Sequence, residues 1–364
     1  MLLPVLPNES NLRARSDASK PPEISGRPPA DFSRGPRLID SHGRAIADLR
    51  LSITDRCNFR CVYCLEPDVK FAAPAHLLTH AELVRVAAAA CSLGVTSIRL
   101  TGGEPTVHPR LLSIISGAAA LPIRDLSMTT NGSLVTPASA ASWKKAGLRR
   151  LTFSLDSTDE AAFSAITRST SSAASIINAI AVAADAGLTP IKVNAVVVRG
   201  RNETQLPALA RLARSHNVQV RFIEYMPLDS ARAWDTSKLV PASEIIASIH
   251  AVFPLEEVGR ECASSTSLHF RFADGAAGSI GVIAPVTRPF CGACSRLRIT
   301  ADGKVRPCLF SRDEWDLRSL LREGASDAAL AELMLDAVWS KQKGHGITSS
   351  GFVQPQRTMS AIGG

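Results

Sequence analysis

The sequence has few aromatic residues and no long apolar run. Aromatic side chains account for 5% of its 364 residues, and only two of them are tyrosines. A membrane-spanning helix needs about 20 predominantly apolar residues, and no stretch of this chain approaches that length. The first residues also lack the charged start and apolar core of a secretory signal. We therefore expect a soluble, cytoplasmic protein with no membrane partner.

The sequence also has no large excess of charge of either sign. Lys and Arg number 41 against 33 Asp and Glu, which gives a formal net charge of +8. This balance is compatible with an anionic ligand, although many basic surfaces bind none. Surfaces that bind nucleic acid combine clustered cations with aromatic side chains. The shortage of aromatics therefore argues against nucleic acid as a partner.

Residues 1–37 are rich in Pro, Ser and Arg and show no apolar periodicity. Such a segment cannot bury enough apolar surface to fold, so we predict a disordered N-terminal tail. A mitochondrial targeting segment is the alternative. Those segments avoid acidic residues, whereas this one contains Glu9, Asp17, Glu23 and Asp31.

From Leu49 onward, short β-rich runs alternate with helical patterns rich in Ala and Leu. We predict strands at 49–54, 97–102, 125–131, 150–156, 191–198 and 219–225. Helices are predicted between them at 80–93, 109–120, 137–146, 173–186 and 204–215, and then at 241–251. The spacing of roughly 30 residues per unit is that of a β/α barrel, but six units fall short of the usual eight. The pattern predicts an α/β fold, either a partial TIM-type barrel over residues 38–255 or a doubly wound sheet.

Side-chain alternation within the strands favours the partial barrel. Helices cover both faces of a doubly wound sheet, so its strands read as nearly continuous apolar runs. Here one parity is apolar and the other is polar, and the polar parity carries Arg50, Arg99, Lys192 and Arg221. If these cations face a lumen, they need an anionic occupant or carboxylate partners. A solvated sheet face is the alternative.

The pattern changes after Leu255 to shorter strands separated by turns. We predict strands at 267–273, 278–284, 296–300 and 304–309, with Gly-containing turns such as Asp274-Gly275 that are typical of antiparallel pairs. Helical patterns follow near 313–322 and 327–343. We therefore predict a C-terminal antiparallel β plus helical extension over residues 256–345, and a tail over residues 346–364.

Six of the eight cysteines fall into two groups of three. Cys57, Cys61 and Cys64 lie within eight residues, directly after the first predicted strand. A structural zinc site and a fully ligated iron–sulfur cubane each take four protein ligands. A cubane held by three Cys leaves one iron open to a substrate or cofactor, and zinc completed by His76 or His80 is the alternative.

The second group consists of Cys291, Cys294 and Cys308. By itself this spacing fits a zinc ribbon with a distant ligand as well as it fits a cluster. Cys262 is available as that ligand, although nothing in the spacing selects it. Cys91 lies in an apolar helical pattern and is expected to be a small buried hydrophobe.

Polar segments recur at the predicted carboxyl ends of the strands, where barrel enzymes place their active sites. They include Gly102-Gly103-Glu104, Thr129 to Asn131, Ser154 to Asp156, and Glu224 to Met226. A Gly-Gly pair permits close approach of the backbone to a bound molecule. The adjacent Glu104 offers an acceptor for an ammonium or hydroxyl group.

Cys57-x3-Cys61-x2-Cys64 with Tyr63 before the last Cys, followed by Gly-Gly-Glu-Pro, resembles the radical S-adenosylmethionine (SAM) superfamily. Within it, the chain from about Leu38 to Gly364 is similar to the GTP 3′,8-cyclase family of molybdenum cofactor biosynthesis. The motifs that carry this resemblance are LSITDRC from Leu51, RLTGGE from Arg99, TTNG from Thr129, RFIEYM from Arg221, CGACSRLR from Cys291 and the terminal Gly-Gly.

The resemblance implies two [4Fe-4S] clusters, one on Cys57, Cys61 and Cys64 and one on Cys291, Cys294 and Cys308. The positions that match the family's SAM contacts are Tyr63, Gly103, Ser154 and Met226. Those that match its GTP contacts are Arg50, Arg99, Thr129, Lys192, Arg296, Leu297 and Arg298. Further candidate positions are Glu104, Asn131, Arg221, Gly363 and Gly364, with the Gly-Gly tail expected to reach the active site.

The implied reaction is the radical cyclisation of GTP to (8S)-3′,8-cyclo-7,8-dihydroguanosine 5′-triphosphate, with no catalytic side chain. The implied partners are an electron donor such as flavodoxin or ferredoxin, the downstream cyclic pyranopterin monophosphate synthase, and a second copy of the chain in a homodimer. Ser97 and His108 depart from the family pattern, which has a Lys and an Arg there. The alternatives are a radical SAM peptide- or protein-modifying enzyme with an auxiliary cluster, and a zinc-bearing nucleic-acid-binding protein.

Overall fold

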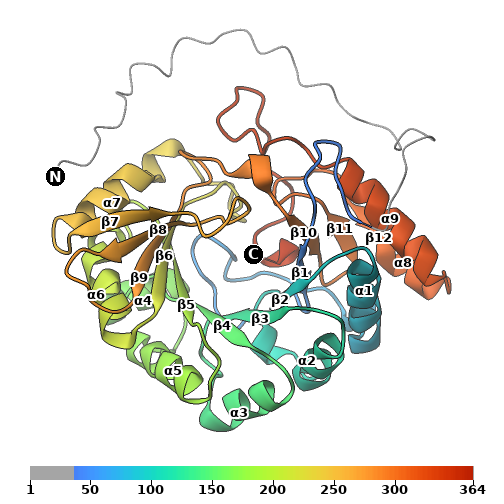
Figure 1. Ribbon diagram of the computed structural model, residues 1–364, viewed down its shortest axis with the longest axis horizontal. Helices are drawn as coiled ribbons and strands as arrows, with labels where there is room; N and C mark the ends of the chain where they lie inside the picture. Colours follow the sequence, from blue (N-terminus) through green and yellow to red (C-terminus); the bar gives the residue numbers. More distant parts are fainter. Residues whose placement is uncertain (1–36, 364) are drawn as a thin grey trace.

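The computed structural model describes residues 37–363. All but the last residue of the predicted N-terminal tail, and Gly364, lie outside the described residues. Six parallel strands form a curved wall in chain order (Figure 1). They are β1 (Asp48–Ser52), β2 (Ser97–Thr101), β3 (Asp125–Thr130), β4 (Arg150–Ser154), β5 (Lys192–Val197) and β6 (Gln219–Glu224). The predicted α/β partial barrel is confirmed.

Helices surround the outside of this wall (Figure 1). They are α1 (His80–Ser92), α2 (Leu111–Ala119), α3 (Pro137–Lys145), α5 (Ala173–Asp185), α6 (Leu206–His216) and α7 (Ala242–His250). The short helix α4 (Glu160–Thr167) lies instead beside the loop after β1, because its last two carbonyls accept hydrogen bonds from the amides of Val62 and Arg60. Helix α1 begins where it does because Thr79 forms a capping box: its side chain accepts a hydrogen bond from the Glu82 amide, and the Glu82 carboxylate accepts one from the Thr79 amide. The sequence pattern did not predict α4, a helix of about two turns that lies between β4 and α5 in the chain.

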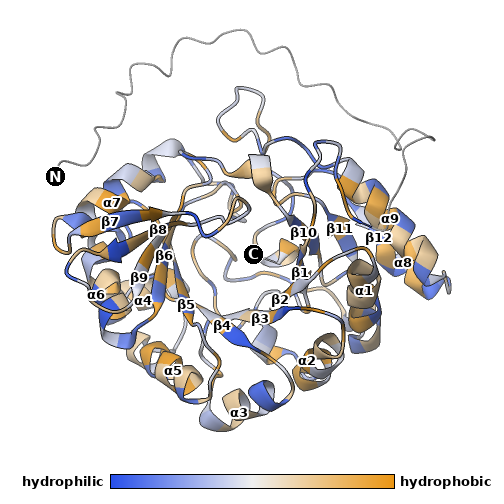
Figure 2. Cartoon of the chain, in the orientation of Figure 1, coloured by the Kyte–Doolittle hydropathy of each residue, from blue (hydrophilic) through white to orange (hydrophobic). Residues whose placement is uncertain are grey.

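The apolar parity predicted for the strands forms the core between the strands and the helices. Leu49, Leu51, Ile98, Leu100 and Leu151 are at most 1% exposed, and they point toward the helices because alternate residues of a strand face opposite sides. Figure 2 shows both orange and blue stretches along the surrounding helices, as expected for helices with one face on the sheet and one outside. The other parity of the strands faces the interior of the barrel.

The C-terminal strands extend both ends of the barrel wall. They are β7 (Leu255–Gly259), β8 (Leu268–Phe272), β9 (Ser279–Ile283), β10 (Arg296–Ile299), β11 (Lys304–Arg306) and β12 (Trp315–Asp316). The sheet order is β12-β11-β10-β1-β2-β3-β4-β5-β6-β9-β8-β7. The antiparallel pairs β8–β9 and β10–β11 match the prediction, whereas β9 pairs in parallel with β6 and β10 in parallel with β1. The residues of a turn predict that the two strands next to it form a hairpin, but they do not predict which other strand of the sheet that hairpin pairs with.

Two helices, α8 (Leu317–Arg322) and α9 (Asp327–Trp339), complete the C-terminal part. Helix α9 packs beside α1 (Figure 1). The sequence pattern extended this helix to residue 343, but it ends at Trp339, which leaves residues 340–343 as a separate segment. Among the described residues, no helix has both the length and the apolarity that crossing a membrane requires.

Candidate active site

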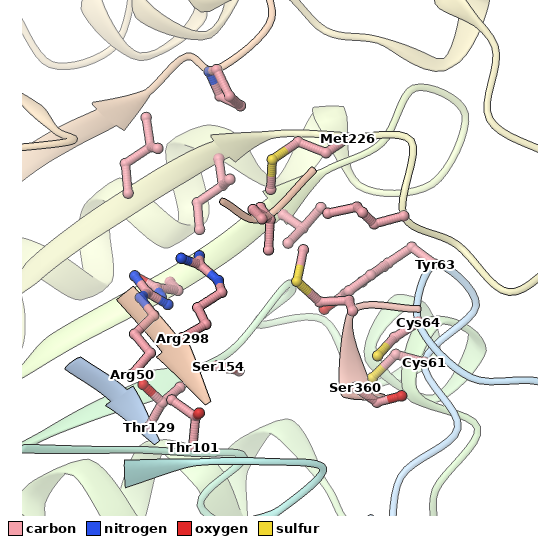
Figure 3. Close-up of a pocket in the computed structure, with 18 of the residues that line it drawn as sticks. Arg50, Cys61, Tyr63, Cys64, Thr101, Thr129, Ser154, Met226, Arg298 and Ser360 are labelled. Atoms are coloured by element: carbon pink, nitrogen blue, oxygen red, sulfur yellow. The ribbon is translucent and has the colours of Figure 1, made fainter. Parts of the chain in front are cut away.

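A cavity of about 300 Å³ lies at the carboxyl ends of the barrel strands. All six grouped cysteines line it. The other predicted site residues that line it are Arg50, Tyr63, Gly103, Glu104, Thr129, Asn131, Ser154, Arg221, Met226, Arg296 and Arg298. Figure 3 shows Arg50 and Arg298 close together at one end and Cys61, Cys64 and Tyr63 at the other. The fold thus brings two Cys groups that are 227 residues apart in sequence (291 − 64) to one chamber.

Three predicted GTP contacts do not line this cavity. Arg99 lies deeper in the barrel, where its Nη1 donates hydrogen bonds to Thr152 Oγ1 at 3.0 Å and Thr129 Oγ1 at 3.5 Å. Lys192 lies level with Thr152 in the strand register. Leu297 has the opposite parity to its two Arg neighbours and is fully buried in the core, so its side chain points away from theirs.

The strand register gathers the lumen cations. Arg298, Arg50 and Arg99 are direct neighbours across β10, β1 and β2. Burial, followed by the repulsion of neighbouring arginines, lowers the pKa of Arg50 well below its usual range. Burial likewise lowers the pKa of Arg221 to about 9 and that of Lys192 to about 8. A group of cations in this state is stabilised by an anionic ligand or by carboxylate partners, the two possibilities that the alternation leaves open.

The loop that carries the first Cys group is held by backbone hydrogen bonds on two sides. Arg60 N donates to Thr167 O and Val62 N to Ile166 O, each at 2.9 Å, which fixes the loop against the end of α4. On the other side Glu104 N donates to Arg56 O at 2.7 Å. The Cys loop is therefore built into the barrel rather than attached at its surface.

The Gly102-Gly103 pair is required by this loop. A Cβ atom on Gly103 would lie 2.3 Å from the carbonyl oxygen of Arg56, and one on Gly102 would lie 2.4 Å from that of Thr54. We predicted that the pair admits a bound molecule, but the close approach in the structure is to the chain's own backbone. The assignment of Gly103 as a SAM contact stays a prediction.

Two buried carboxylates stand near the first Cys group. Asp156 accepts hydrogen bonds from Tyr63 Oη at 2.6 Å and Val196 N at 2.8 Å, and burial raises its pKa to about 6. Glu104 is 1% exposed and accepts hydrogen bonds from the amides of Thr106 and Asn131 and the hydroxyls of Thr106 and Thr130. Glu104 thus joins the ends of β2 and β3 in addition to lining the cavity.

The thiols of the first group are strongly desolvated. Burial raises the pKa of Cys57 to about 11 and that of Cys64 to about 12, and the other thiols of the group contribute to the rise at Cys61 and Cys64. Sulfur ligands bind metal as thiolates, which a metal cation stabilises. Within residues 37–363, no three His, Cys, Asp or Glu side chains are placed to hold a single metal ion. The fit of this group to a cluster rests on three thiols that border one cavity.

The second Cys group has a cationic environment. Arg296 Nη2 donates to Cys294 Sγ at 3.3 Å, and Gln342 Nε2 lies 3.8 Å from Cys308 Sγ as a donor. Burial raises the pKa of Cys294, but Arg296 and Lys341 outweigh it and lower that pKa to about 6. A thiolate is therefore favoured at this position, as a metal ligand requires.

The alternative ligands lie away from the cavity. Cys262 is exposed in the β7–β8 loop, where its sulfur is 3.4 Å from Ser264 Oγ. Cys91, His76 and His80 are not among the described residues that line the cavity. Ser97 begins β2 at the end opposite to the cavity, and His108 Nδ1 accepts a hydrogen bond from Arg110 N on the outer side of the Gly-Gly-Glu-Pro turn.

The C-terminal tail enters the mouth of the barrel, and Figure 1 shows the last described residues near the centre of the ring of strands. Met359 and Ser360 line the cavity, and Met359 N donates to Leu228 O at 3.1 Å. Gly363 has a φ of +70°, and a Cβ there would lie 2.7 Å from Thr101 Oγ1. Sequence reasoning did not single out Ser360 or the cavity residue Lys341, because neither belongs to a recognisable motif.

Two known families match the chain in succession. Residues 51–213 match the radical SAM superfamily, and residues 218–347 match the family described as Molybdenum Cofactor Synthesis C. The GTP 3′,8-cyclase of Streptomyces coelicolor is 44% identical over 330 residues, which cover 90% of this chain and 96% of that protein. The GTP 3′,8-cyclase of Mycolicibacterium smegmatis is 45% identical over 342 residues, 92% of this chain and 93% of that protein.

This chain belongs to the GTP 3′,8-cyclase family. A solved structure of SuiB from Streptococcus suis, bound to the precursor peptide SuiA, has a TM-score of 0.60 and 13% identity, and covers 88% of this chain and 77% of that chain. At that identity the likeness concerns the fold alone. The cyclase relatives, in contrast, match this chain in sequence over nearly its whole length. Each Cys group lies within one of the two regions that match a known family.

Proposed function

We propose that this protein converts GTP to (8S)-3′,8-cyclo-7,8-dihydroguanosine 5′-triphosphate, the first step of molybdenum cofactor biosynthesis, as a radical SAM lyase. One observation carries the proposal: two three-thiol groups border a single cavity whose interior is lined with arginines. Three thiols at each group fit a [4Fe-4S] cluster with one open coordination position. The family membership of the chain supports the same activity.

In this proposal Cys57, Cys61 and Cys64 hold the cluster that binds SAM, and Cys291, Cys294 and Cys308 hold a second cluster. When bound, the first cluster and SAM supply the radical that removes a hydrogen atom from the substrate ribose. Tyr63, Gly103, Ser154 and Met226 are assigned to SAM. Tyr63 is well suited to a positioning role, because its hydroxyl is fixed by Asp156 at 2.6 Å.

The substrate occupies the cationic part of the cavity. Arg50, Thr129, Arg296 and Arg298 line the cavity and are assigned to GTP. Arg99, Lys192 and Leu297, which do not line it, are assigned to GTP as well, with Arg221 and Asn131 as further contacts. Arg and Lys bind phosphate oxygens through charge-assisted hydrogen bonds, and arginine adds a forked donor geometry. The protein therefore contributes binding, orientation and exclusion of water, while the bond-making chemistry is the cofactors'.

The proposed activity also assigns a role to each part of the chain and implies its partners. Residues 38–255 form the radical SAM barrel, 256–345 the part with the second cluster, and 346–364 the tail with Gly363 and Gly364 at the active site. A cytoplasmic flavodoxin or ferredoxin donates the electrons. The product passes to a cyclic pyranopterin monophosphate synthase, and the chain forms a homodimer.

The test is anaerobic reconstitution with iron and sulfide, followed by incubation with a reductant, SAM and GTP. We expect about eight irons per chain, since each cluster holds four, together with 5′-deoxyadenosine and a cyclised nucleotide. Cys294→Ser should lose about half of the iron, whereas Cys91→Ser, which removes a thiol from α1 away from the cavity, should lose none. Cleavage of SAM without consumption of GTP would favour a peptide-modifying enzyme instead, and a colourless, zinc-containing protein would favour the nucleic-acid-binding alternative.

A further inference from the structure

The second Cys group is carried by three stretches of backbone, here called the Cys291, Cys294 and Cys308 arms. The short segment Lys341–Lys343 contacts the Cys294 and Cys308 arms and is joined to the Cys291 arm through Arg44. It follows the end of α9 at Trp339 and leads toward the C-terminal tail. Lys341 contacts the backbone beside Cys294 and Cys308, Gln342 is a donor toward Cys308 Sγ, and the carbonyls of Gln342 and Lys343 share Arg44 with Cys291 O. One stretch of three residues thus joins parts of the chain that lie between residues 291 and 308.

Lys341 is the centre of this arrangement. It is 3% exposed, and its Nζ donates hydrogen bonds to Arg296 O at 2.8 Å and to Pro307 O. Arg296 is two residues after Cys294, and Pro307 immediately precedes Cys308. Because one ammonium group holds both carbonyls, it fixes the spacing between the Cys294 arm and the Cys308 arm.

The Cys291 arm is held by Arg44. Arg44 forms a buried ion pair with Asp40, at 2.6 Å between Nε and Oδ2. Its Nη1 donates to Cys291 O at 2.7 Å and to Lys343 O at 3.0 Å, and its Nη2 donates to Gln342 O at 2.8 Å. The segment is therefore fixed at both ends, which leaves the Lys341 side chain little freedom to move away.

The hydrogen-bond partners of Lys341 distinguish it from the arginines that line the cavity. Two of the three N–H groups of its ammonium are taken by backbone carbonyls, so its main bonds are to the protein rather than to a ligand. Its positive charge nevertheless acts on the sulfurs of Cys294 and Cys308. A buried cation next to a cluster favours the reduced state, because reduction adds negative charge, and such charges tune cluster potentials.

We propose that Lys341 is a positioning residue that holds the Cys294 and Cys308 arms of the second cluster together and makes that cluster easier to reduce. This inference rests on the second cluster of the proposed function. It assigns to one side chain both the assembly of the cluster and its readiness to accept an electron from a low-potential donor.

The experiment is a potentiometric titration of the reconstituted full-length protein with dithionite, followed by electron paramagnetic resonance. Addition of SAM identifies the signal of the first cluster, and addition of GTP that of the second. Lys341→Gln removes the charge and keeps a donor for one carbonyl, and Lys341→Met removes both. Lys343→Met is the matched control, because it removes the same charge from an exposed side chain two residues away.

We expect Lys341→Gln to make reduction of the second cluster at least tenfold less favourable, which is a shift of 59 mV toward negative potential for a one-electron couple. The first cluster should keep its potential and serves as the internal reference. Lys341→Met should show the same shift or lose the four irons of the second cluster alone. Lys343→Met should match the wild type in both respects.

An unchanged second potential in a Lys341→Gln protein that retains both clusters would overturn the inference, as would an equal shift in Lys343→Met. Failure of the proposed function has a different signature, because the wild-type protein would then either assemble fewer than two clusters or cleave SAM without consuming GTP. Iron and sulfide counts and a GTP assay of the wild type, made before any variant is titrated, separate these cases.

Discussion

Replacing Gly363 with alanine should release the C-terminal tail from the mouth of the barrel. Gly363 has a φ of +70°, a left-handed conformation that costs an L-residue about 1–2 kcal/mol. The added Cβ would also lie 2.7 Å from Thr101 Oγ1 and 3.1 Å from Ser52 Cβ, at the ends of β2 and β1. Crowding of this kind in a packed site costs about 1–3 kcal/mol. The two effects together oppose docking of the tail by about 2–5 kcal/mol.

Arg357 joins the tail to Asp302 and Glu314 through ion pairs, and two further contacts hold it closer to Gly363. Ile362 is fully buried, and burial of an isoleucine side chain stabilises by about 1.5–3 kcal/mol. The hydrogen bond from Met359 N to Leu228 O adds about 0.5–1.5 kcal/mol. A penalty of this size should lower the equilibrium constant for docking of the tail at least about tenfold, because a tenfold change needs only about 1.4 kcal/mol.

Hydrogen exchange of residues 357–363 measures docking directly, and GTP turnover measures its effect on the reaction. Gly363→Ala should lose protection in this segment and lose turnover with it. Gly351→Ala is the matched control, since no atom lies within 4 Å of a Cβ built at that position. Normal protection and turnover in Gly363→Ala would show that the tail tolerates the side chain and that the packing argument is wrong. Normal turnover with lost protection would show that the reaction does not need the docked tail.

Three further predictions concern single side chains of the site. Burial lowers the pKa of Lys192 to about 8, so this lysine loses its charge as the pH rises through 8. The KM for GTP, measured by initial rates, should therefore increase between pH 7 and 9. Lys192→Arg should remove this increase. Arg44→Met leaves the buried Asp40 carboxylate without its partner and should lower the free energy of unfolding by about 3–5 kcal/mol in a denaturant titration, whereas removal of the exposed Arg199–Glu244 pair should change it by less than about 1 kcal/mol. Glu104→Gln replaces an acceptor by an amide that faces the Asn131 N–H and should cost about 1–3 kcal/mol in the same titration; an unchanged midpoint would contradict the buried hydrogen-bond set described above.

The barrel interior could be predicted from the sequence because strand alternation is a local property. Arg50 and Arg221 share a parity with the polar residues of their strands, and both line the cavity in the structure. The pairing of β9 with β6 and of β10 with β1 could not be predicted in this way. Which strand docks at the edge of a sheet depends on residues far away in the chain, and turn residues carry no information about them.

Some features of the site are not visible in the sequence because a residue type has more than one physical use. Gly102 and Gly103 admit the backbone of the Cys loop, a contact that is invisible until the loop has folded back on β2. The position of Lys341 depends on where α9 ends, and helix ends are the part of a helix that sequence patterns locate least well. Its two carbonyl partners come from residues 296 and 307, which no spacing rule connects to it.

The two ends of the cavity differ in charge, and this difference suits two different ligands. Near the first Cys group stand the buried carboxylates Glu104 and Asp156, whereas Arg296, Arg298 and Lys341 lie near the second. SAM carries a sulfonium and an ammonium group, which acidic surroundings stabilise, while a nucleoside triphosphate is anionic and is attracted to the arginines. Exchange of the two ligands would place like charges together at both ends. The polarity of the chamber thus supports the proposed placement of SAM at the first Cys group and of GTP at the second, independently of any specific contact with the adenine or guanine base.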